Sequence, residues 1–337
     1  MLKKTSIRVL PLRRPVNSIV LAMDVIVISA QAVFPLLGFM MIGYFFRKKN
    51  FLDESSTKQL NLICFRFFLS LTCAETIYKA DIRQIAEPLP IIIVSLSIII
   101  TFLVAWLIVP RFIKQKDQIP VMIQGIYKTN YTLVGLSVAK SICGENNVGM
   151  VSLITVLLVP INNVLSVYIF ERYTGNKGSG TPMIVRILKN PLVLGSLIGI
   201  ALNLSGIVIP KWIMTGFIAK LSALTTPLSM IALGASFNFS KVPLYKTKIA
   251  WAVFAKLVLV PMFVLPVTIL LGVRGASLIA VAIYAVAPNA VNSFNTAVAM
   301  GGDGDLANEI VVMSAIVSIL TMFGWFLLIG YTVGFGV

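Results

Sequence analysis

The 337-residue sequence contains no histidine and only three cysteines. Without histidine, no catalytic triad or proton relay that depends on imidazole is possible. The cysteines, Cys64, Cys73 and Cys143, are scattered in or near apolar runs, so they indicate neither a disulfide framework nor a metal site. Walker, HExxH and GxSxG motifs are missing as well. The sequence therefore predicts a protein that is not an enzyme and that uses no cofactor and no metal.

Charged residues are also scarce, at 12% of the chain against 58% hydrophobic residues, and the mean hydropathy is +0.95. A soluble domain could not cover so much apolar surface with polar side chains. This composition excludes a soluble enzyme, a secreted disulfide scaffold and a disordered chain. The net charge of +16 would suggest nucleic acid in a soluble protein, but here the basic residues form short clusters between apolar runs. That pattern is typical of the cytoplasmic loops of a membrane protein, with no nucleic-acid partner.

Ten apolar segments have the length that a helix needs to cross a bilayer, about 20 residues. Alternating segments typical of a membrane β-barrel are missing. The sequence thus predicts an all-α polytopic membrane protein with ten transmembrane helices. The ten segments are Val25–Phe46, Asn61–Tyr78, Pro88–Pro110, Gln118–Ala139, Val148–Phe170, Asn190–Pro210, Leu221–Ser240, Ile249–Val273, Gly275–Gly302 and Ile310–Val337.

The two halves of the chain share landmarks at nearly constant spacing. Pro35 and Gly43 are followed 156 residues later by Pro191 and Gly199, and Pro110 is followed by Pro266 at the same spacing. Asn130 and Asn289 are 159 residues apart. These matches predict an internal duplication. Because each repeat would contain an odd number of helices, five, the second must enter the membrane from the opposite face, as in many transporters.

The repeat divides the chain into four parts: a basic extension over 1–22, a first five-helix repeat over 23–171, a connector over 172–189 and a second repeat over 190–337. The extension has no acidic residue and no separate apolar core, so we expect it to be disordered or to lie upstream of a natural start at Met23. When the connections are assigned alternately to two sides, most Lys and Arg fall on one side. That side is predicted to be cytoplasmic, with both termini outside the cell membrane.

Polar residues concentrate in the fourth and ninth segments. Lys128–Ser137 reads KTNYTLVGLS and Pro288–Thr296 reads PNAVNSFNT. Gly135 and Pro288 weaken a helix, and a broken helix is tolerated at membrane depth only where it faces protein or a watery cavity. We therefore expect helices 4 and 9 to be broken at a substrate site, where helix N-termini would attract an anion. The alternative is that the Asn, Ser and Thr side chains only hold helices together.

Basic residues within apolar segments are functional candidates, because a charge at membrane depth costs a few kcal/mol or more. Lys128 is the first candidate for recognition of a substrate charge. Lys256 is either functional or placed near an interface by snorkelling. Arg66 and Glu75 are too far apart in sequence to pair on one helix face, which leaves the partner of Arg66 undefined.

Acidic residues in the apolar segments are rarer still. Glu75 is the one that lies clearly inside a segment. Asp303, Asp305 and Glu309 are expected to precede the tenth helix and are interpreted as N-terminal caps, with a proton-coupling role as the alternative. The aspartate pair expected of a cation antiporter is missing, which favours an anionic or neutral substrate. The predicted substrate-binding residues are Lys128, Asn130, Gly135, Ser137, Pro288, Asn289, Asn292 and Asn295.

Several longer motifs resemble the bacterial branch of the auxin efflux carrier family, which includes malate-permease-type members. The most specific are TPLSMIALGASF at Thr226–Phe237 and APNAVNSFNTAVAMGGDGDLA at Ala287–Ala307. LNLICFRFF at Leu60–Phe68 and NPL at Asn190–Leu192 support them, and the resemblance covers nearly the whole chain from Met23. The sequence departs from the family at Ser70 and Ser137, where proline is common, and from its plant members at Asn292, where they carry proline.

The resemblance implies ten helices in two inverted five-helix repeats, with broken helices 4 and 9 crossing at the substrate site. It also implies secondary transport of organic anions such as carboxylates by an elevator-like motion. We therefore expect a permease for a small organic anion, with the lipid bilayer as its environment. The Gly195–Gly199 motif permits a homodimer. The alternatives are an ion-coupled antiporter or channel of the same architecture and, with little support, a membrane-embedded enzyme.

Overall fold

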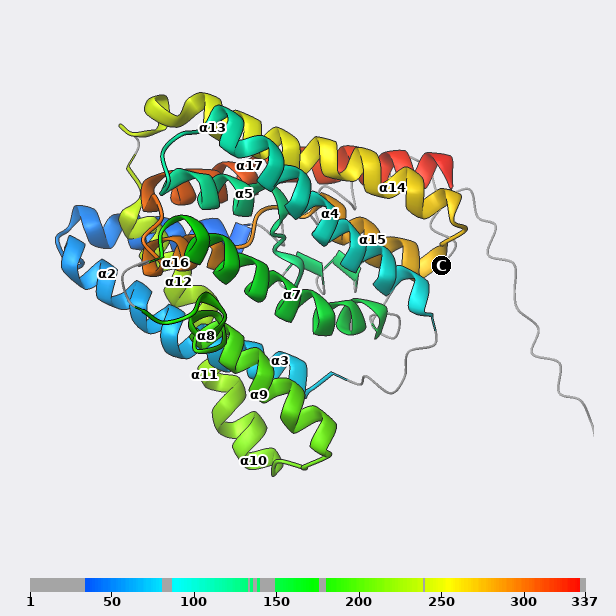
Figure 1. Cartoon of the computed structure of the whole chain (residues 1–337), viewed down its shortest axis with the longest axis horizontal. Coiled ribbons are helices and arrows are strands. Elements are labelled where there is room, and N and C mark those ends of the chain that lie inside the picture. The colour runs from blue at the N-terminus through cyan, green and yellow to red at the C-terminus, as the bar shows by residue number, and fades with distance from the viewer. Residues whose placement is uncertain are drawn as a thin grey trace, which may run out of the picture.

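The structure, a computed structural model of the chain, describes residues 34–80, 87–132, 134–135, 138–139, 149–175, 180–238 and 240–333. Every regular element in these ranges is a helix, and no strand occurs in them (Figure 1). The extension predicted over 1–22, Cys143 and the predicted site residue Ser137 lie outside the described residues.

Six helical stretches are long and apolar enough to cross a membrane. They are Glu54–Tyr78, Pro88–Phe112, Gly149–Tyr173, Lys211–Ser236, Val242–Leu270 and Gly304–Thr332. The other four predicted segments contain shorter helices, over residues 34–48 and in α5, α9 and α15 with α16. The all-helical membrane architecture expected from the sequence is therefore confirmed.

The helices, with π-helical turns labelled η, have the following bounds. They are α2 (Glu54–Ile63), η1 (Cys64–Phe68), α3 (Leu69–Tyr78), α4 (Pro88–Phe112), α5 (Gln118–Tyr127), α7 (Gly149–Tyr173), α8 (Met183–Leu188), α9 (Pro191–Ser205), α10 (Lys211–Ile213), η4 (Met214–Ile218), α11 (Ala219–Ala223), α12 (Thr225–Ser236), α13 (Val242–Phe254), η5 (Ala255–Leu259), α14 (Val260–Leu270), α15 (Gly275–Val286), α16 (Asn292–Ala299) and α17 (Gly304–Thr332).

The start of α17 corrects one prediction. The Asp303 carboxylate accepts a hydrogen bond from the backbone N–H of Leu306 at 3.0 Å, so Asp303 is the N-terminal cap, as expected. Because the helix begins at Gly304, well before the uncharged run starts at Ile310, the prediction that Asp305 and Glu309 precede the helix is wrong. Glu309 lies inside α17 and is 1% exposed.

The helices form two groups, which meet where α7 contacts α3 and α9 and where α16 contacts α2 and α12 (Figure 1). The first group contains α2, α3 and α9 to α12, together with the helix over residues 34–48, which packs on α12. The second contains α4, α5, α7 and α13 to α17. Within the second group, α15 is enclosed by its neighbours: every residue from Ser277 to Val286 is buried. A helix that is apolar on all sides suits such a position.

Glycines allow the first group to pack backbone against backbone. A Cβ added at Gly43 would lie 2.1 Å from the carbonyl oxygen of Ile231, and one added at Gly234 would lie 2.0 Å from that of Met40. Both positions exclude any side chain, because the obstacle is main chain rather than a movable group. The helix over residues 34–48 is thereby fixed against α12.

The second backbone contact joins α9 to α3. A Cβ at Gly195 would lie 2.3 Å from the Ser70 carbonyl oxygen, and one at Gly199 would lie 2.7 Å from that of Ala74. The Gly195–Gly199 motif is therefore used for packing within this chain.

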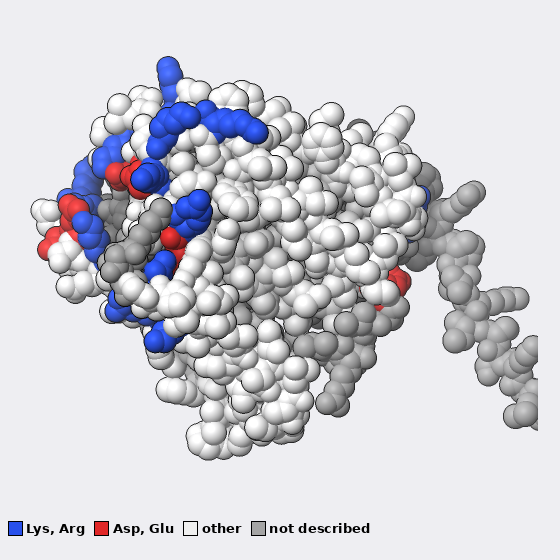
Figure 2. All heavy atoms as spheres, viewed as in Figure 1, with Lys and Arg blue, Asp and Glu red and all other residues white. Residues whose placement is uncertain are grey.

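Basic residues gather at one end of the molecule. Figure 2 shows Lys and Arg side chains where α2 and α13 begin. The rest of the face in view carries almost no charged side chains. The last described helix, α17, ends at the opposite end (Figure 1). At the basic end, the ammonium of Lys241 donates to the Asp305 carboxylate at 2.5 Å. This hydrogen bond raises the pKa of Lys241 above its ordinary value.

Candidate functional site

Both polar segments singled out in the sequence interrupt their helices. α5 ends at Tyr127, Lys128–Asn130 is not helical, and helical conformation resumes at Tyr131. α15 ends at Val286, and α16 begins only at Asn292. The predicted break at Pro288 is therefore present. Gly135 lies five residues after the break in the fourth segment, in helical conformation, and its predicted part in a substrate site stays a prediction. A Cβ at Gly135 would meet Ile283 and Val151 side chains at 3.3 Å, so this residue serves helix packing.

The two breaks contact each other directly. The backbone N–H of Asn130 donates to the Pro288 carbonyl at 2.9 Å. The Asn289 side chain donates to the Gln124 carbonyl, in the last turn of α5, at 3.1 Å. Its own backbone N–H donates to the Ser314 hydroxyl at 3.2 Å. Hydrogen bonds thus join the two interruptions in both directions, and the Gln124 carbonyl accepts from Asn289 in addition to the backbone N–H of Lys128.

The reciprocal contact explains why proline suits position 288. The helical partner of the Tyr284 carbonyl would be the N–H of residue 288, and proline has none. The Thr129 hydroxyl donates to that carbonyl instead, at 3.2 Å. Thr129 therefore caps the end of α15 from the other break, while Asn289 adds a second hydrogen bond at the end of α5.

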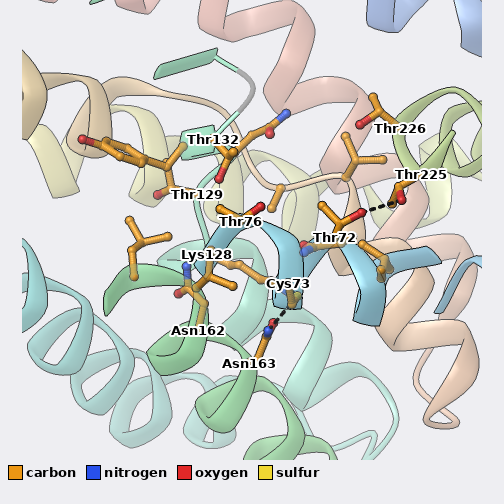
Figure 3. A pocket seen from close by; sticks show the side chains of 18 of the residues that line it. Thr72, Cys73, Thr76, Lys128, Thr129, Thr132, Asn162, Asn163, Thr225 and Thr226 are labelled. Carbon is orange, nitrogen blue, oxygen red and sulfur yellow. Dashed lines mark hydrogen bonds between the residues drawn. The ribbon is translucent and has the colours of Figure 1, made fainter. Parts of the chain in front are cut away.

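A cavity of about 130 Å³ lies at this crossing, between the two helix groups (Figure 3). At about 30 Å³ per water, this volume equals roughly four water molecules. Its walls are rich in hydroxyl and amide groups. The first group contributes Leu69, Thr72, Cys73, Thr76, Thr225, Thr226 and Ser229. The second contributes Lys128, Thr129, Asn130, Tyr131, Thr132, Leu158, Val159, Asn162, Asn163, Ala290, Val291 and Asn292.

Lys128 lines this cavity and is 1% exposed. Its ammonium donates to the Gln124 side-chain oxygen at 3.0 Å, with the amide oriented to satisfy its hydrogen bonds to Ser166 and Ser293. No carboxylate in the described part of the chain forms an ion pair with it. A buried charge without a counter-ion is costly, so Lys128 creates a strong preference for an anion in the cavity.

Lys256 is equally buried but lies outside the cavity wall. At 0% exposure it does not snorkel to an interface, so that alternative is wrong. Its ammonium donates to the Thr129 hydroxyl and, at 3.5 Å, to the Tyr284 carbonyl. It also lies 5.3 Å from the centre of the Tyr284 ring, at cation–π distance. Lys256 therefore holds the two breaks together from behind the cavity.

The predicted asparagines separate into two kinds. Asn130 and Asn292 line the cavity, and the Asn130 amide nitrogen and Asn292 amide oxygen have no hydrogen-bond partner among the described residues. Asn289 and Asn295 do not line it. Asn289 caps α5, and the Asn295 amide donates to the Ser229 hydroxyl at 2.6 Å. The structure thus brings Lys128, Asn130 and Asn292 together at one cavity.

Several cavity residues were missed by the sequence analysis. Asn162 and Asn163 lie on α7, and Thr225 and Thr226 begin α12. The hydroxyls of Thr72 and Thr225 are 2.7 Å apart across the wall. The sequence feature that could have identified these residues is the occurrence of adjacent polar pairs inside apolar runs. Among the described residues, no group of His, Cys, Asp and Glu could hold a metal ion.

Comparison with known proteins identifies the family. Residues 28–326 match the family profile described as membrane transport protein. The chain belongs to this family. The match confirms the resemblance to auxin efflux carriers that the motifs indicated. This transporter is 23% identical to an uncharacterized transporter of Methanothermobacter thermautotrophicus over 307 residues, covering 88% of this chain and 97% of the relative. It is 24% identical to the uncharacterized transporter YfdV of Escherichia coli K12 over 242 residues, covering 68% and 75% of the two chains.

Family membership makes the polar crossing the natural candidate site of this transporter. A transporter requires a small-molecule substrate and a membrane environment, and the cavity combines polar walls with burial among apolar helices. Irregular backbone at membrane depth is tolerated where it lines such a cavity.

Proposed function

We propose that this protein is a secondary transporter of small organic anions, such as carboxylates, across the cell membrane. The substrate binds in the cavity where the broken fourth and ninth helices cross. The observation that carries this proposal is Lys128: its buried ammonium faces a polar cavity and has no carboxylate partner among the described residues. A substrate carboxylate would supply the missing counter-charge.

The surrounding groups fit a carboxylate. The unpartnered amide nitrogen of Asn130 is a donor at the cavity wall. α16 begins at Asn292, also at the wall, and places the positive end of its dipole there. Together, these groups bind the charged end of a substrate, while Leu69, Leu158 and Val159 accept its apolar part.

The proposed architecture has ten membrane crossings in two inverted repeats, over 23–171 and 190–337. The glycine contacts support it. Gly43 and Gly199 are 156 positions apart, and their backbone partners, Ile231 and Ala74, are 157 apart. A helix of each repeat therefore packs on the other repeat in an equivalent way. The clustered Lys and Arg (Figure 2) support a cytoplasmic position for the basic end, and with it the proposal that both termini lie outside.

The transport step is proposed to be an elevator-type movement of one helix group against the other. The cavity lies between the groups and takes wall residues from both. The first group is fixed internally by main-chain contacts at its glycines. It therefore suits the role of a rigid support along which the group carrying Lys128 and both breaks moves.

The test is charge movement in proteoliposomes exposed to malate and indole-acetate, with chloride as the control. A saturable current for one carboxylate, lost in Lys128→Met but kept in the exposed-site variant Lys246→Gln, supports the proposal. For an electroneutral carrier, uptake of the radiolabelled compound replaces current. Equal uptake by Lys128→Met and the unchanged protein would remove Lys128 from the site.

A second candidate, an ion-coupled antiporter of the same architecture, is favoured by one observation. The buried Glu309 has one carboxyl oxygen without a partner among the described residues. An intramembrane carboxyl group of this kind is a candidate coupling site for a cation. Uptake driven by a pH or Na⁺ gradient, lost in Glu309→Gln but kept in the exposed Glu54→Gln, would select this candidate.

A further inference from the structure

A second cavity, of about 450 Å³, lies at the basic end of the molecule. Its walls come from η1, the end of α7, the start of α9 and the end of α16, including Phe65, Arg66, Glu171, Asn190 and Met300. It shares no lining residue with the central cavity. It is also larger, and two of its wall residues, Glu171 and Asn190, adjoin the basic residues Arg172 and Lys189 in the sequence.

Arg66 is the basic side chain in the wall of this second cavity. Among the described residues it forms no ion pair. Glu75, on the same helical stretch, is paired with Lys79 at 2.5 Å. Glu171, the carboxylate in the same wall, is paired with Arg186 at 2.7 Å. The guanidinium of Arg66 is therefore free to bind a carboxylate in a bidentate manner.

The position of Arg66 on a π-helical turn links the two cavities. Phe65, Leu69 and Cys73 follow one another at four-residue spacing and form one apolar cluster with Leu192. Leu69 and Cys73 line the central cavity, whereas Phe65 lines the second. At 1.5 Å per residue, Arg66 lies about 10 Å along the helix axis from Cys73. The lining residues Phe65 and Leu69, about one helical turn apart, thus form an apolar barrier between the cavities.

We propose that the second cavity is a docking site for the organic carboxylate at the basic face, with Arg66 as its binding residue. From this site the anion reaches Lys128 when the barrier of Phe65 and Leu69 opens. The inference rests on the proposed function, because it assumes an anionic substrate. It adds a separate site that faces one side of the membrane only.

The experiment measures malate transport from each side separately, in proteoliposomes of known protein orientation. Arg66→Gln is expected to raise KM about tenfold or more from the basic side, because a charge-assisted hydrogen bond is lost, with kcat from that side unchanged. Since the transport equilibrium fixes the ratio of kcat/KM in the two directions, the matching change from the opposite side should be a lower kcat at unchanged KM. Arg66→Lys should recover part of the affinity. Arg172→Gln, which removes an exposed charge at the same end but outside the cavity wall, should leave both KM values unchanged.

The outcomes separate the two proposals. An equal rise in KM on both sides, or the same rise in Arg172→Gln, would overturn the docking site while leaving the proposed function intact. Lys128→Met is expected to abolish transport from both sides, and this variant tests the central cavity. No malate transport by the unchanged protein would count against both proposals.

The same guanidinium could take its anion from a lipid headgroup. Phosphatidylcholine vesicles with and without phosphatidylserine distinguish this source. An effect of Arg66→Gln that persists without the anionic lipid supports substrate docking. An effect that disappears with that lipid would assign Arg66 to the headgroup and overturn the docking site.

Discussion

The glycine contacts of the first helix group and the central cavity are packed in opposite ways. At Gly195 on α9, main chain meets the Ser70 carbonyl so closely that a methyl group has no room. At the cavity, the Asn130, Asn162 and Asn292 amides each retain an atom without a partner among the described residues. Each such atom costs about 1–3 kcal/mol when buried. The comparison teaches that tight apolar packing maintains this fold, while the crossing gives up stability to leave polar groups for a ligand.

The largest effect is expected from a methyl group in a glycine contact. Gly43→Ala places a Cβ against the Ile231 carbonyl, with main chain on both sides, and should cost more than about 3 kcal/mol. Gly38→Ala in the same helix is the control, because a Cβ there meets nothing within 4 Å. Thermal unfolding in detergent checks the pair. A Gly43→Ala protein as stable and monodisperse as Gly38→Ala would contradict the packing described for this contact.

The reverse result is expected in the cavity. Lys128→Met should abolish substrate binding but should not lower thermal stability, because it removes a buried charge that lacks a counter-ion. Lys256→Met should lower stability, since Thr129 and Tyr284 lose the ammonium that joins them. Unfolding temperatures measured with and without substrate report both the stability of each variant and its substrate binding. Equal destabilisation by the two substitutions would erase the distinction between the lysines.

A smaller difference is expected between two asparagines that the sequence makes equivalent. Asn130→Ala removes a cavity donor and should weaken substrate affinity about tenfold with little change in stability. Asn289→Ala removes the cap on α5 and should cost about 1 kcal/mol of stability, with a smaller change in affinity. Titration calorimetry and unfolding should be measured on both proteins. If Asn289→Ala weakened substrate affinity more than Asn130→Ala, the substrate would lie on the α15 side of the crossing.

The smallest effect is expected at the basic end, outside both regions. Lys241→Gln breaks the exposed pair with Asp305 and should cost about 0.2–1 kcal/mol, whereas Lys246→Gln should cost nothing measurable. Because the pair raises the pKa of Lys241, its contribution is complete below the ordinary lysine pKa and is lost as pH rises through the raised value. Unfolding across alkaline pH checks the sign. A contribution that grows with rising pH would refute it.

Much of the fold follows from sequence because apolar run length and proline position are local signals. The break at Pro288 and the burial of Lys128 near it were predictable for this reason. The partners of these residues were not, because hydrogen bonds from Thr129 to Tyr284 and from Asn289 to Gln124 join positions more than 150 residues apart. Glu309 was misplaced because the uncharged run, rather than the cap at Asp303, was taken as the start of the helix. The contact between Thr72 and Thr225 in the cavity wall was not predictable either, because it depends on how α3 packs against α12.

The reciprocal caps at the crossing have a consequence for how such a protein changes over evolutionary time. Thr129 caps a helix of the second half of the chain, and Asn289 donates to the main chain of a helix of the first. The loss of either side chain removes a hydrogen bond that joins one half to the other. Substitutions at the two breaks should therefore be inherited together, and a half exchanged from a distant relative should function only when both interruptions come from the same parent.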